Sequence, residues 1–281
     1  MSHKTTLILV AAVAFGGVLM SSGADGLRAA PPQKTANYNI PLWEPGKVPG
    51  ALGDGPLDAP FLTVFPAPEG KRNGGAVIIA PGGSNIMLMY GAEGLDAAER
   101  YNDWGVTAFI LTYRLSPRYA EELRVMEGKR AVQLVRSRAK EWGVDPSKVG
   151  YIGFSAGSNT GRSVVATAAP GNPDAPDPID RFSSRPDYLV LVYGPGGATP
   201  GEQLKNFPPT LLVSAAGDRQ PSLGNAQLFM DLTRAGAVAE IHVYQQGRHG
   251  FGSGFGSPQF GGWMTDLKSF LTLDGFLPAA K

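Results

Sequence analysis

One serine in this chain of 281 residues stands in a context that could turn its hydroxyl group into a nucleophile. The segment Gly153-Phe154-Ser155-Ala156-Gly157 matches the pattern G-x-S-x-G, which is short enough to occur by chance. Here it follows an apolar segment (KVGYIG) and opens a run of small residues (AGSNTGRSVVATAA). That order is typical of the sharp strand-to-helix turn that lifts a serine above the carboxyl edge of a sheet. Ser155 is therefore the candidate nucleophile, and a helix-capping serine is the alternative.

A serine hydroxyl is a weak nucleophile unless a base takes its proton. The chain has three histidines, and His3 lies in a segment that we expect to be removed. His242 lies within the apolar segment AEIHVY and reads as a half-exposed strand residue, whereas His249 follows that segment in a loop (GRHGF). Because chemistry in open α/β sheets gathers at the carboxyl edge, we expect His249 to lie near Ser155 and to act as the base. A surface loop histidine is the alternative.

The chain order Ser, acid, His places the acid that orients the imidazole between Ser155 and His249. Asp218 directly follows the apolar segment TLLVSAAG, so it reaches the same edge of the sheet as the other two residues. We therefore expect Asp218 to be this acid, with a turn aspartate as the alternative. The other acids in this interval are Asp174, Asp177 and Asp180, which read as turn formers in a Pro-rich loop, and Asp187, Asp231, Glu202 and Glu240.

Acyl transfer also needs hydrogen-bond donors for the oxyanion that develops on the substrate. One should be the backbone N–H of Ala156, the residue after the nucleophile. The other should come from the loop after an early strand, which here reads Pro81-Gly82-Gly83-Ser84 after AVIIA. We expect Gly83 to supply it, with Ser84 or Gly82 as alternatives.

Three segments are expected to shape the pockets for the acyl group and the alcohol, because they lie at the same edge. They are Asn85–Tyr90, Tyr113–Arg114 and Gly252–Phe260. The candidate substrate-binding residues are Asn85, Tyr90, Tyr113 and the adjoining Phe251. Ordinary packing is the alternative for each of them.

Short apolar segments that alternate with longer amphipathic ones must position these residues. Several of the apolar segments are almost continuously hydrophobic (AVIIA, VTAFIL, YLVLVY, TLLVSA), as parallel strands covered on both faces are. The predicted strands are Phe61–Phe65, Ala76–Ala80, Val106–Thr112, Lys148–Gly153, Tyr188–Tyr193, Thr210–Ala215 and Glu240–Tyr244. The alternation predicts an α/β fold with a mostly parallel sheet and helices on both faces.

The intervening segments have helical periodicity. The clearest is Val125–Trp142, which has an apolar stripe containing Val132 and Val135, while Arg130 and Arg136 line the other side. The remaining predicted helices are Gly94–Trp104, Ala156–Ala168, Asn225–Ala235 and Trp263–Leu273.

The composition excludes other chemistries. The chain has no cysteine, which excludes disulfides, thiolate metal sites and cysteine nucleophiles. A formal net charge of +1 gives no electrostatic basis for binding nucleic acid or an anionic membrane. A hydrophobic fraction of 43% is that of a folded globular protein.

The N-terminal residues predict export. In residues 1–24, Lys4 precedes an uncharged, mostly apolar run and Ala24 lies at a small-residue cleavage site, which is typical of a signal peptide. The apolar run is shorter than the about 20 residues that span a bilayer, and a retained anchor is the alternative. Residues 25–60 are rich in Pro and Gly and read as an extended arm, and residues 61–281 read as the catalytic domain.

Taken together, the ordered blocks resemble α/β-hydrolases of the acetylesterase and acetylxylan-esterase-like type, which are related to bacterial carbohydrate esterases. The resemblance covers about residues 40–278 and rests on the PGG loop, TAFILTYRL, WGVDPSKVGYIGFSAGS, RPDYLVLVYG, PPTLLVSAAGD and HVYQQGRHGFG. It implies a Ser-His-Asp triad of Ser155, His249 and Asp218. The chain departs from the family in having Ser84-Asn85 where relatives have a third glycine and an aromatic residue, and Ser158-Asn159 after the serine turn.

These observations predict a serine carboxylesterase that hydrolyses short acyl esters, acetyl above all, on small-molecule or oligosaccharide substrates through an acyl-enzyme. No cofactor, metal or nucleic acid is expected, nor stable membrane insertion after the signal peptide is cleaved, and the protein should be periplasmic or secreted. The oligomeric state stays open. The alternatives are a catalytically silent α/β-hydrolase that binds a sugar or a protein, and a serine peptidase on the same fold.

Overall fold

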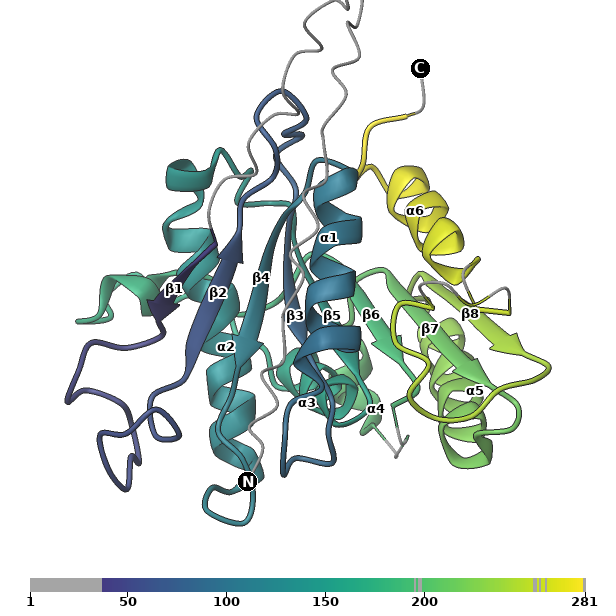
Figure 1. Cartoon of the computed structure of the whole chain (residues 1–281), viewed down its shortest axis with the longest axis horizontal. Coiled ribbons are helices and arrows are strands. Elements are labelled where there is room, and N and C mark those ends of the chain that lie inside the picture. The colour runs from purple at the N-terminus through teal and green to yellow at the C-terminus, as the bar shows by residue number, and fades with distance from the viewer. Residues whose placement is uncertain are drawn as a thin grey trace, which may run out of the picture. The chain divides into compact units, whose positions relative to one another are not determined.

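Short apolar segments along the chain form an eight-stranded sheet in the computed structural model (Figure 1). The structure describes residues 37–194, 196, 199–254, 257, 259–260 and 262–279. The strand order is β1-β2-β4-β3-β5-β6-β7-β8, in which the β1–β2 and β2–β4 pairs are antiparallel and the others parallel. The strands are β1 (Tyr38–Pro41), β2 (Phe61–Phe65), β3 (Ala76–Ala80), β4 (Thr107–Thr112), β5 (Val149–Phe154), β6 (Leu189–Val192), β7 (Thr210–Ala215) and β8 (Ala239–Tyr244).

The predicted α/β fold is confirmed, and every predicted strand is present with ends within one residue of those expected. Strand β1 was not predicted, because a four-residue strand in a Pro- and Gly-rich segment has too few residues to show periodicity. It adds an antiparallel edge strand next to β2 and buries Ile40. The predicted signal peptide and residues 25–36 of the predicted arm lie outside the described residues.

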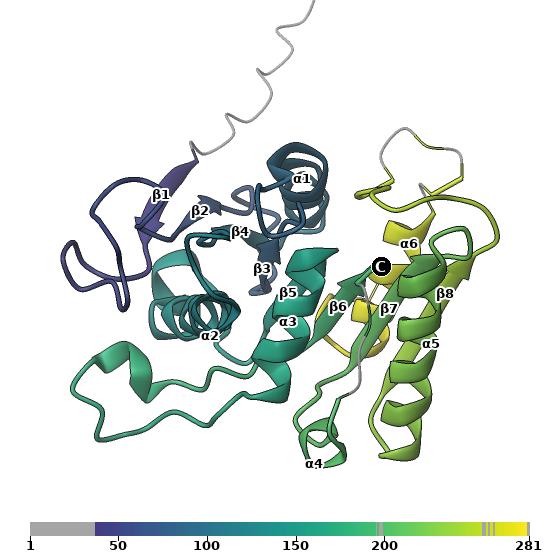
Figure 2. The same ribbon diagram turned by 90° about the horizontal axis from the view of Figure 1, so that it is seen from below.

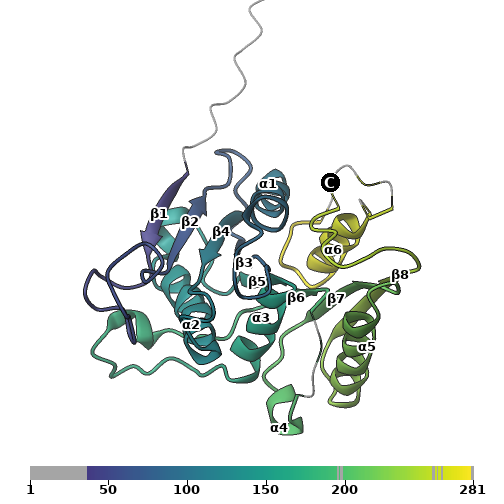
Figure 3. The same ribbon diagram turned by 60° about the horizontal axis from the view of Figure 1, so that its bottom comes forward.

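Helices cover both faces of the sheet because the strands are apolar on both sides. In β3, Ala76, Ile78 and Ala80 join one core cluster, while Val77 and Ile79 join the other. Helices α1 and α6 lie over one face, and α2, α3 and α5 lie over the opposite face (Figures 2 and 3). The helices are α1 (Asp96–Asp103), α2 (Glu121–Ser137), α3 (Ala156–Ala166), α4 (Gly201–Leu204), α5 (Arg219–Arg234) and α6 (Trp263–Leu273), and the short helices are η1 (Tyr90–Leu95), η2 (Ala139–Trp142) and η3 (Pro178–Arg181).

Helix α5 begins six residues before the predicted start at Asn225, and α2 begins four residues before Val125. The first turns of both helices are mostly polar, so they carry no apolar stripe from which to place the start. The earlier start of α5 puts Asp218 directly at its N-terminal end.

Helix α2 is buried on its charged side as well as on its apolar stripe. Val132 and Val135 are fully buried, and Arg130 and Arg136 are only 5% and 9% exposed. Arg130 donates to the Leu42 carbonyl and pairs with the carboxylates of Asp177 and Asp180 at η3. It therefore links the segment that follows β1 to α2. The charged side of α2 therefore faces protein rather than solvent.

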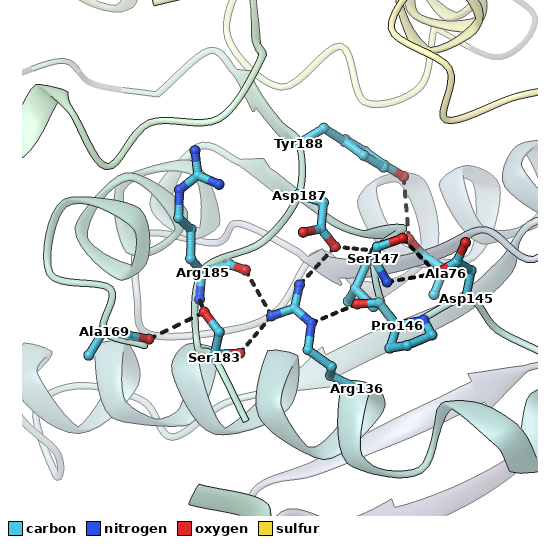
Figure 4. A network of polar contacts seen from close by, with 11 residues as sticks. Ala76, Arg136, Asp145, Pro146, Ser147, Ala169, Ser183, Arg185, Asp187 and Tyr188 are labelled. Carbon is cyan, nitrogen blue, oxygen red and sulfur yellow. Dashed lines mark hydrogen bonds and ion pairs between the residues drawn. The ribbon is translucent and has the colours of Figure 1, made fainter. Parts of the chain in front are cut away.

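Arg136 is the centre of a polar network beyond the amino ends of β5 and β6 (Figure 4). Its guanidinium donates to the carbonyls of Pro146 (2.8 Å), Ser183 (2.6 Å) and Arg185 (2.9 Å), and it pairs with Asp187 at 2.7 Å. The same Asp187 oxygen accepts the backbone N–H of Val149 at 2.8 Å. This single side chain therefore joins the loops that lead into both strands.

No helix within the described residues is long and apolar enough to cross a bilayer.

Replacing Arg136 is expected to destabilise the fold. The change Arg136→Met keeps the volume but leaves the Asp187 carboxylate and three carbonyls without their partner, so the free energy of unfolding should fall by about 3–5 kcal/mol. Arg138→Met, which breaks the more exposed pair with Glu141, is the matched control and should change it by less than about 1 kcal/mol. Urea unfolding at pH 7 measures both values, and equal losses would contradict the prediction.

Candidate active site

The turn between β5 and α3 holds Ser155 in a conformation that few non-glycine residues adopt. Its φ is 51° and its ψ is −114°, outside the regions that L-residues favour. Three backbone hydrogen bonds hold this turn, because the Ser155 N–H donates to the Val192 carbonyl and the Ser155 carbonyl accepts from Ser158 and Asn159. The turn lifts the side chain of Ser155 out at the carboxyl end of β5.

Glycine is required beside the serine because α3 approaches β3 very closely. A Cβ atom at Gly157 would lie 2.1 Å from the Ala80 carbonyl oxygen and 2.7 Å from that of Pro81. No side chain fits in this space, since these contacts are with backbone atoms. The second glycine of the G-x-S-x-G pattern is therefore a packing requirement of the turn.

Three side chains from three loops form a chain of hydrogen bonds at this edge. Ser155 Oγ lies 2.6 Å from His249 Nε2, and His249 Nδ1 lies 2.6 Å from Asp218 Oδ2. The His249 side chain is 45% exposed, so solvent and a ligand can reach it, whereas the Asp218 carboxyl group is 15% exposed. This geometry can pass a proton from the hydroxyl to the imidazole while the carboxylate holds the ring.

The structure places the other acids of the interval elsewhere. Asp177 and Asp180 pair with Arg130, and Asp187 pairs with Arg136. Asp231 pairs with Arg234 on the surface of α5. His242 lies on β8 with its Nε2 atom 2.6 Å from Glu240 Oε1, and its side chain is 31% exposed, in agreement with its interpretation as a half-exposed strand residue.

Two of the three candidate donors in the loop after β3 have a free N–H group. The Gly82 N–H donates to Glu93 Oε2 at 2.6 Å, which removes it from the candidates. Within the described part of the chain, no acceptor is found for the N–H groups of Gly83, Ser84 and Ala156. Gly83, with a φ of 127°, takes a backbone conformation that L side chains rarely adopt.

Ser84 and Asn85, which follow the paired glycines of this loop, also have positive φ angles. Ser84 has a φ of 56° and Asn85 a φ of 60°. Glycine takes such a backbone without strain, and asparagine is among the side chains that tolerate it best. Residues 83–85 therefore have positive φ angles in succession.

The four candidate substrate-binding residues have different surroundings. A cavity of about 360 Å³ lies between residues 56–60, Ile86, Leu88 and residues 112–119, and Tyr113 is in its wall. The Tyr113 hydroxyl, however, donates to the Pro81 carbonyl at 2.6 Å and so supports the loop after β3. Neither Ser155 nor His249 lines this cavity.

None of the other three candidates lines this cavity, although Asn85 adjoins its wall. The Asn85 carbonyl accepts from the N–H of Ser116 at 2.7 Å, and Tyr90 is half-buried at the start of η1. Phe251 stacks on Phe260 at 4.5 Å and meets Tyr193 edge to face at 4.6 Å. Substrate binding by these residues stays a prediction.

Sequence reasoning missed two buried residues of the site, Glu93 and Tyr193. Glu93 is 3% exposed, and Tyr193 is fully buried against His249, with ring centres 4.9 Å apart. Tyr193 follows the segment YLVLV at the carboxyl edge, which is a signal that could have identified it. Glu93 carries no such signal, because it stands alone in YGAEGL and nothing there marks it as buried.

Among the described residues, no group of three or more His, Asp or Glu side chains is arranged to hold a metal ion.

Comparison with protein families finds no family model that matches this chain. Two curated proteins are similar in sequence. The acetylxylan esterase of Xylanibacter ruminicola is 28% identical over 214 residues, which are 65% of this chain and 42% of that protein. The endo-1,4-beta-xylanase B of Butyrivibrio fibrisolvens is 28% identical over 206 residues, which are 62% of this chain and 32% of that protein. The chain thus spans less than half the length of the curated relatives it matches.

Solved structures extend the similarity to nearly the whole chain. The acetyl ester-xyloside bifunctional hydrolase of Caldicellulosiruptor lactoaceticus is 27% identical with a TM-score of 0.77, and the match covers 89% of this chain and all of that one. The chain has an α/β-hydrolase fold and resembles acetylxylan esterases. Esterase 2 of Thermogutta terrifontis, in a structure phosphorylated by paraoxon, shares this fold at 20% identity and a TM-score of 0.69, over 90% of this chain and all of that one.

Enlarging Gly157 is expected to disrupt the turn that holds Ser155. In Gly157→Ala, the new methyl group meets the Ala80 carbonyl, so the free energy of unfolding should fall by about 3 kcal/mol. Gly201→Ala is the matched control, since nothing lies within 4 Å of a Cβ atom there and its φ is not positive. Chemical unfolding of the two variants tests the difference, and a fully stable Gly157→Ala protein would show that the close approach is not a constraint.

Proposed function

We propose that this chain is a serine carboxylic ester hydrolase that removes short acyl groups, acetyl above all, from carbohydrates. The observation that carries the proposal is the pair of 2.6 Å contacts that join Ser155, His249 and Asp218 on a turn with a positive φ. These residue types in this geometry are those of acyl transfer by a serine nucleophile.

In the first half of the reaction, Ser155 Oγ attacks the ester carbonyl carbon while His249 Nε2 takes the hydroxyl proton. The tetrahedral intermediate collapses when its bond to the alcohol oxygen breaks and His249 returns the proton to that oxygen. In the second half, His249 takes a proton from water, whose oxygen attacks the carbonyl carbon of the acyl-enzyme. This second tetrahedral intermediate collapses when its bond to Ser155 Oγ breaks, His249 returns the proton to Oγ, and the acid leaves. Asp218 holds the ring in the correct tautomer and stabilises the imidazolium.

The N–H groups of Ala156 and of Gly83 or Ser84 are the proposed donors to the oxyanion. They come from the loops after β5 and β3, which are neighbours in the sheet, and a Cβ atom at the adjoining Gly82 would lie 2.7 Å from Ser155 Cβ. Donors that are already oriented stabilise the developing charge without rearranging at the moment of reaction. Each is expected to contribute about 100- to 1000-fold in rate.

The carbohydrate substrate is inferred from the relatives. The names of the similar proteins include acetylxylan esterase and acetyl ester-xyloside hydrolase, so both the acetyl group and the sugar come from similarity. The exposed imidazole fits a site that receives a large polar alcohol from solvent. We also propose that residues 1–24 direct export, which would bring the protein to such substrates outside the cytoplasm.

Removing any member of the hydrogen-bonded chain is expected to abolish hydrolysis. Ser155→Ala or His249→Ala should lower kcat by about a million-fold, and Asp218→Asn by about ten-thousand-fold, because the imidazole then takes the wrong tautomer. Hydrolysis of p-nitrophenyl acetate measures the three values. A fluorophosphonate should label wild-type protein at Ser155; absence of labelling in a folded protein would favour the silent binding protein instead.

Short acyl chains are expected to be preferred, because no long apolar segment that would form a lid is visible in the sequence. The kcat/KM for p-nitrophenyl acetate should exceed that for the palmitate ester. The opposite order would indicate a lipase, and cleavage of matched anilides as fast as esters would indicate a peptidase.

A further inference from the structure

Both carboxylate oxygens of Glu93 bind groups that lead to the site. Oε2 accepts the N–H of Gly82 at 2.6 Å, in the loop after β3. Oε1 accepts the hydroxyl of Tyr193 at 2.8 Å, directly after β6. The Tyr193 oxygen in turn accepts the N–H of Gly252 at 2.9 Å, three residues after His249. One buried carboxylate therefore joins the loops that follow β3, β6 and β8.

On the oxyanion side, Gly82 is enclosed between Glu93 and the nucleophile. A Cβ atom there would lie 2.7 Å from Ser155 Cβ and 2.9 Å from Glu93 Oε2. Glu93 takes the first N–H of this loop, and the left-handed turn at Gly83 then redirects the chain. The direction of the next N–H groups thus depends on the hydrogen bond between Gly82 and Glu93.

On the histidine side, the Tyr193 ring lies edge to face with the His249 ring at 4.9 Å. The hydroxyl of Tyr193 is held on both sides, by Glu93 and by Gly252, so the ring that supports the imidazole cannot turn away. Tyr193 also has a φ of 38°, a strained value for a side chain of this size.

We propose, on the basis of the hydrolysis proposed above, that Glu93 is a positioning residue. Its buried carboxylate fixes the positions of the oxyanion loop and the His249 loop relative to Ser155, and it stabilises the positive charge that His249 acquires.

The charge of Glu93 is the unusual part of this arrangement. Within the described residues, no Lys or Arg pairs with it, whereas the buried Glu127 pairs with Arg114. Burial raises the pKa of the Glu93 carboxyl above its usual range, and the Tyr193 hydroxyl, the Gly82 N–H and the charge of His249 act in the opposite direction. The imidazolium is thus the cation that the Glu93 carboxylate has available.

The other titratable groups around Glu93 are uncharged in the working range of an esterase. Tyr193 and Tyr113 face Glu93 from the ends of β6 and β4, and Tyr90 lies on the same short helix as Glu93, η1. Burial raises the pKa of all three phenols. Asp218 faces His249 from the loop after β7. A change in the charge of Glu93 should therefore change the electrostatic stabilisation of the His249 imidazolium.

The test compares kcat, KM and pH profiles of variants on p-nitrophenyl acetate. Glu93→Ala should lower kcat about 100-fold, the size of the effect of one misplaced oxyanion donor, with KM changed less than about threefold. Glu93→Gln keeps both contacts if its oxygen accepts from Gly82 and its amide donates to Tyr193. It should lower kcat about tenfold and move the acidic limb of kcat/KM to lower pH, because the imidazolium loses a nearby negative charge.

Two controls separate positioning from folding. Tyr193→Phe keeps the ring but removes the links to both Glu93 and Gly252. It should lower kcat about tenfold and move the acidic limb less than Glu93→Gln does, because the Glu93 carboxylate stays. Asp187→Asn weakens a buried ion pair at the opposite edge of the sheet, and it should lower the melting temperature while kcat stays at the wild-type value (Figure 4). If Glu93→Ala does not fold, Glu93→Gln and Tyr193→Phe decide the question.

An NMR titration of the histidine Cε1 protons measures the same charge effect without substrate. His3→Ala and His242→Ala identify the other two signals, and Glu93→Gln should move the midpoint for His249 to lower pH. Wild-type kcat together with an unchanged midpoint in Glu93→Gln would overturn the inference, as would kcat losses that follow the melting temperature in every variant. Failure of the proposed function has a different signature, namely full activity in Ser155→Ala.

Discussion

The close contact between the backbones of α3 and β3 is the constraint on which the site depends. Gly157 lies against the Ala80 carbonyl, and this contact sets the angle at which α3 leaves the end of β5. A non-glycine residue with a positive φ costs about 1–3 kcal/mol and persists only where its surroundings determine it. At Ser155 the surroundings are this contact and the hydrogen bond to Val192. The exposed hydroxyl is thus a consequence of helix–strand packing.

Strand order then decides which loops can meet the serine. β3 and β6 flank β5, so the loop after β3 and Tyr193 are direct neighbours of the turn. Strands β7 and β8 lie farther along the sheet, and Asp218 and His249 must reach back from loops that extend beyond the strand ends. Contacts with Tyr193 and Asp218 hold the His249 ring from two sides, so the ring stays near Ser155 at the end of this long loop.

Buried charges are treated differently in different parts of the molecule. Arg114, Arg130 and Arg136 each have a carboxylate partner, so their burial is compensated by opposite charge. Glu93 is compensated by one N–H group and one hydroxyl. A buried carboxylate that has no Lys or Arg partner among the described residues lowers the stability of the fold, and such a loss is typical of functional sites.

The sequence by itself determined the alternation of strands and helices and the strand ends at which Ser155, Asp218 and His249 lie, because apolar periodicity and the small residues of turns are local properties. It did not reveal strand β1, the burial of Arg136 or the acceptor role of Glu93. Those features depend on which distant segments cover a side chain, and Glu93 meets Tyr193 across 100 positions of sequence. Only the tertiary structure decided that the Gly82 N–H is taken and that the donors beside it are free, since a backbone amide has the same sequence signature whether or not it is bonded.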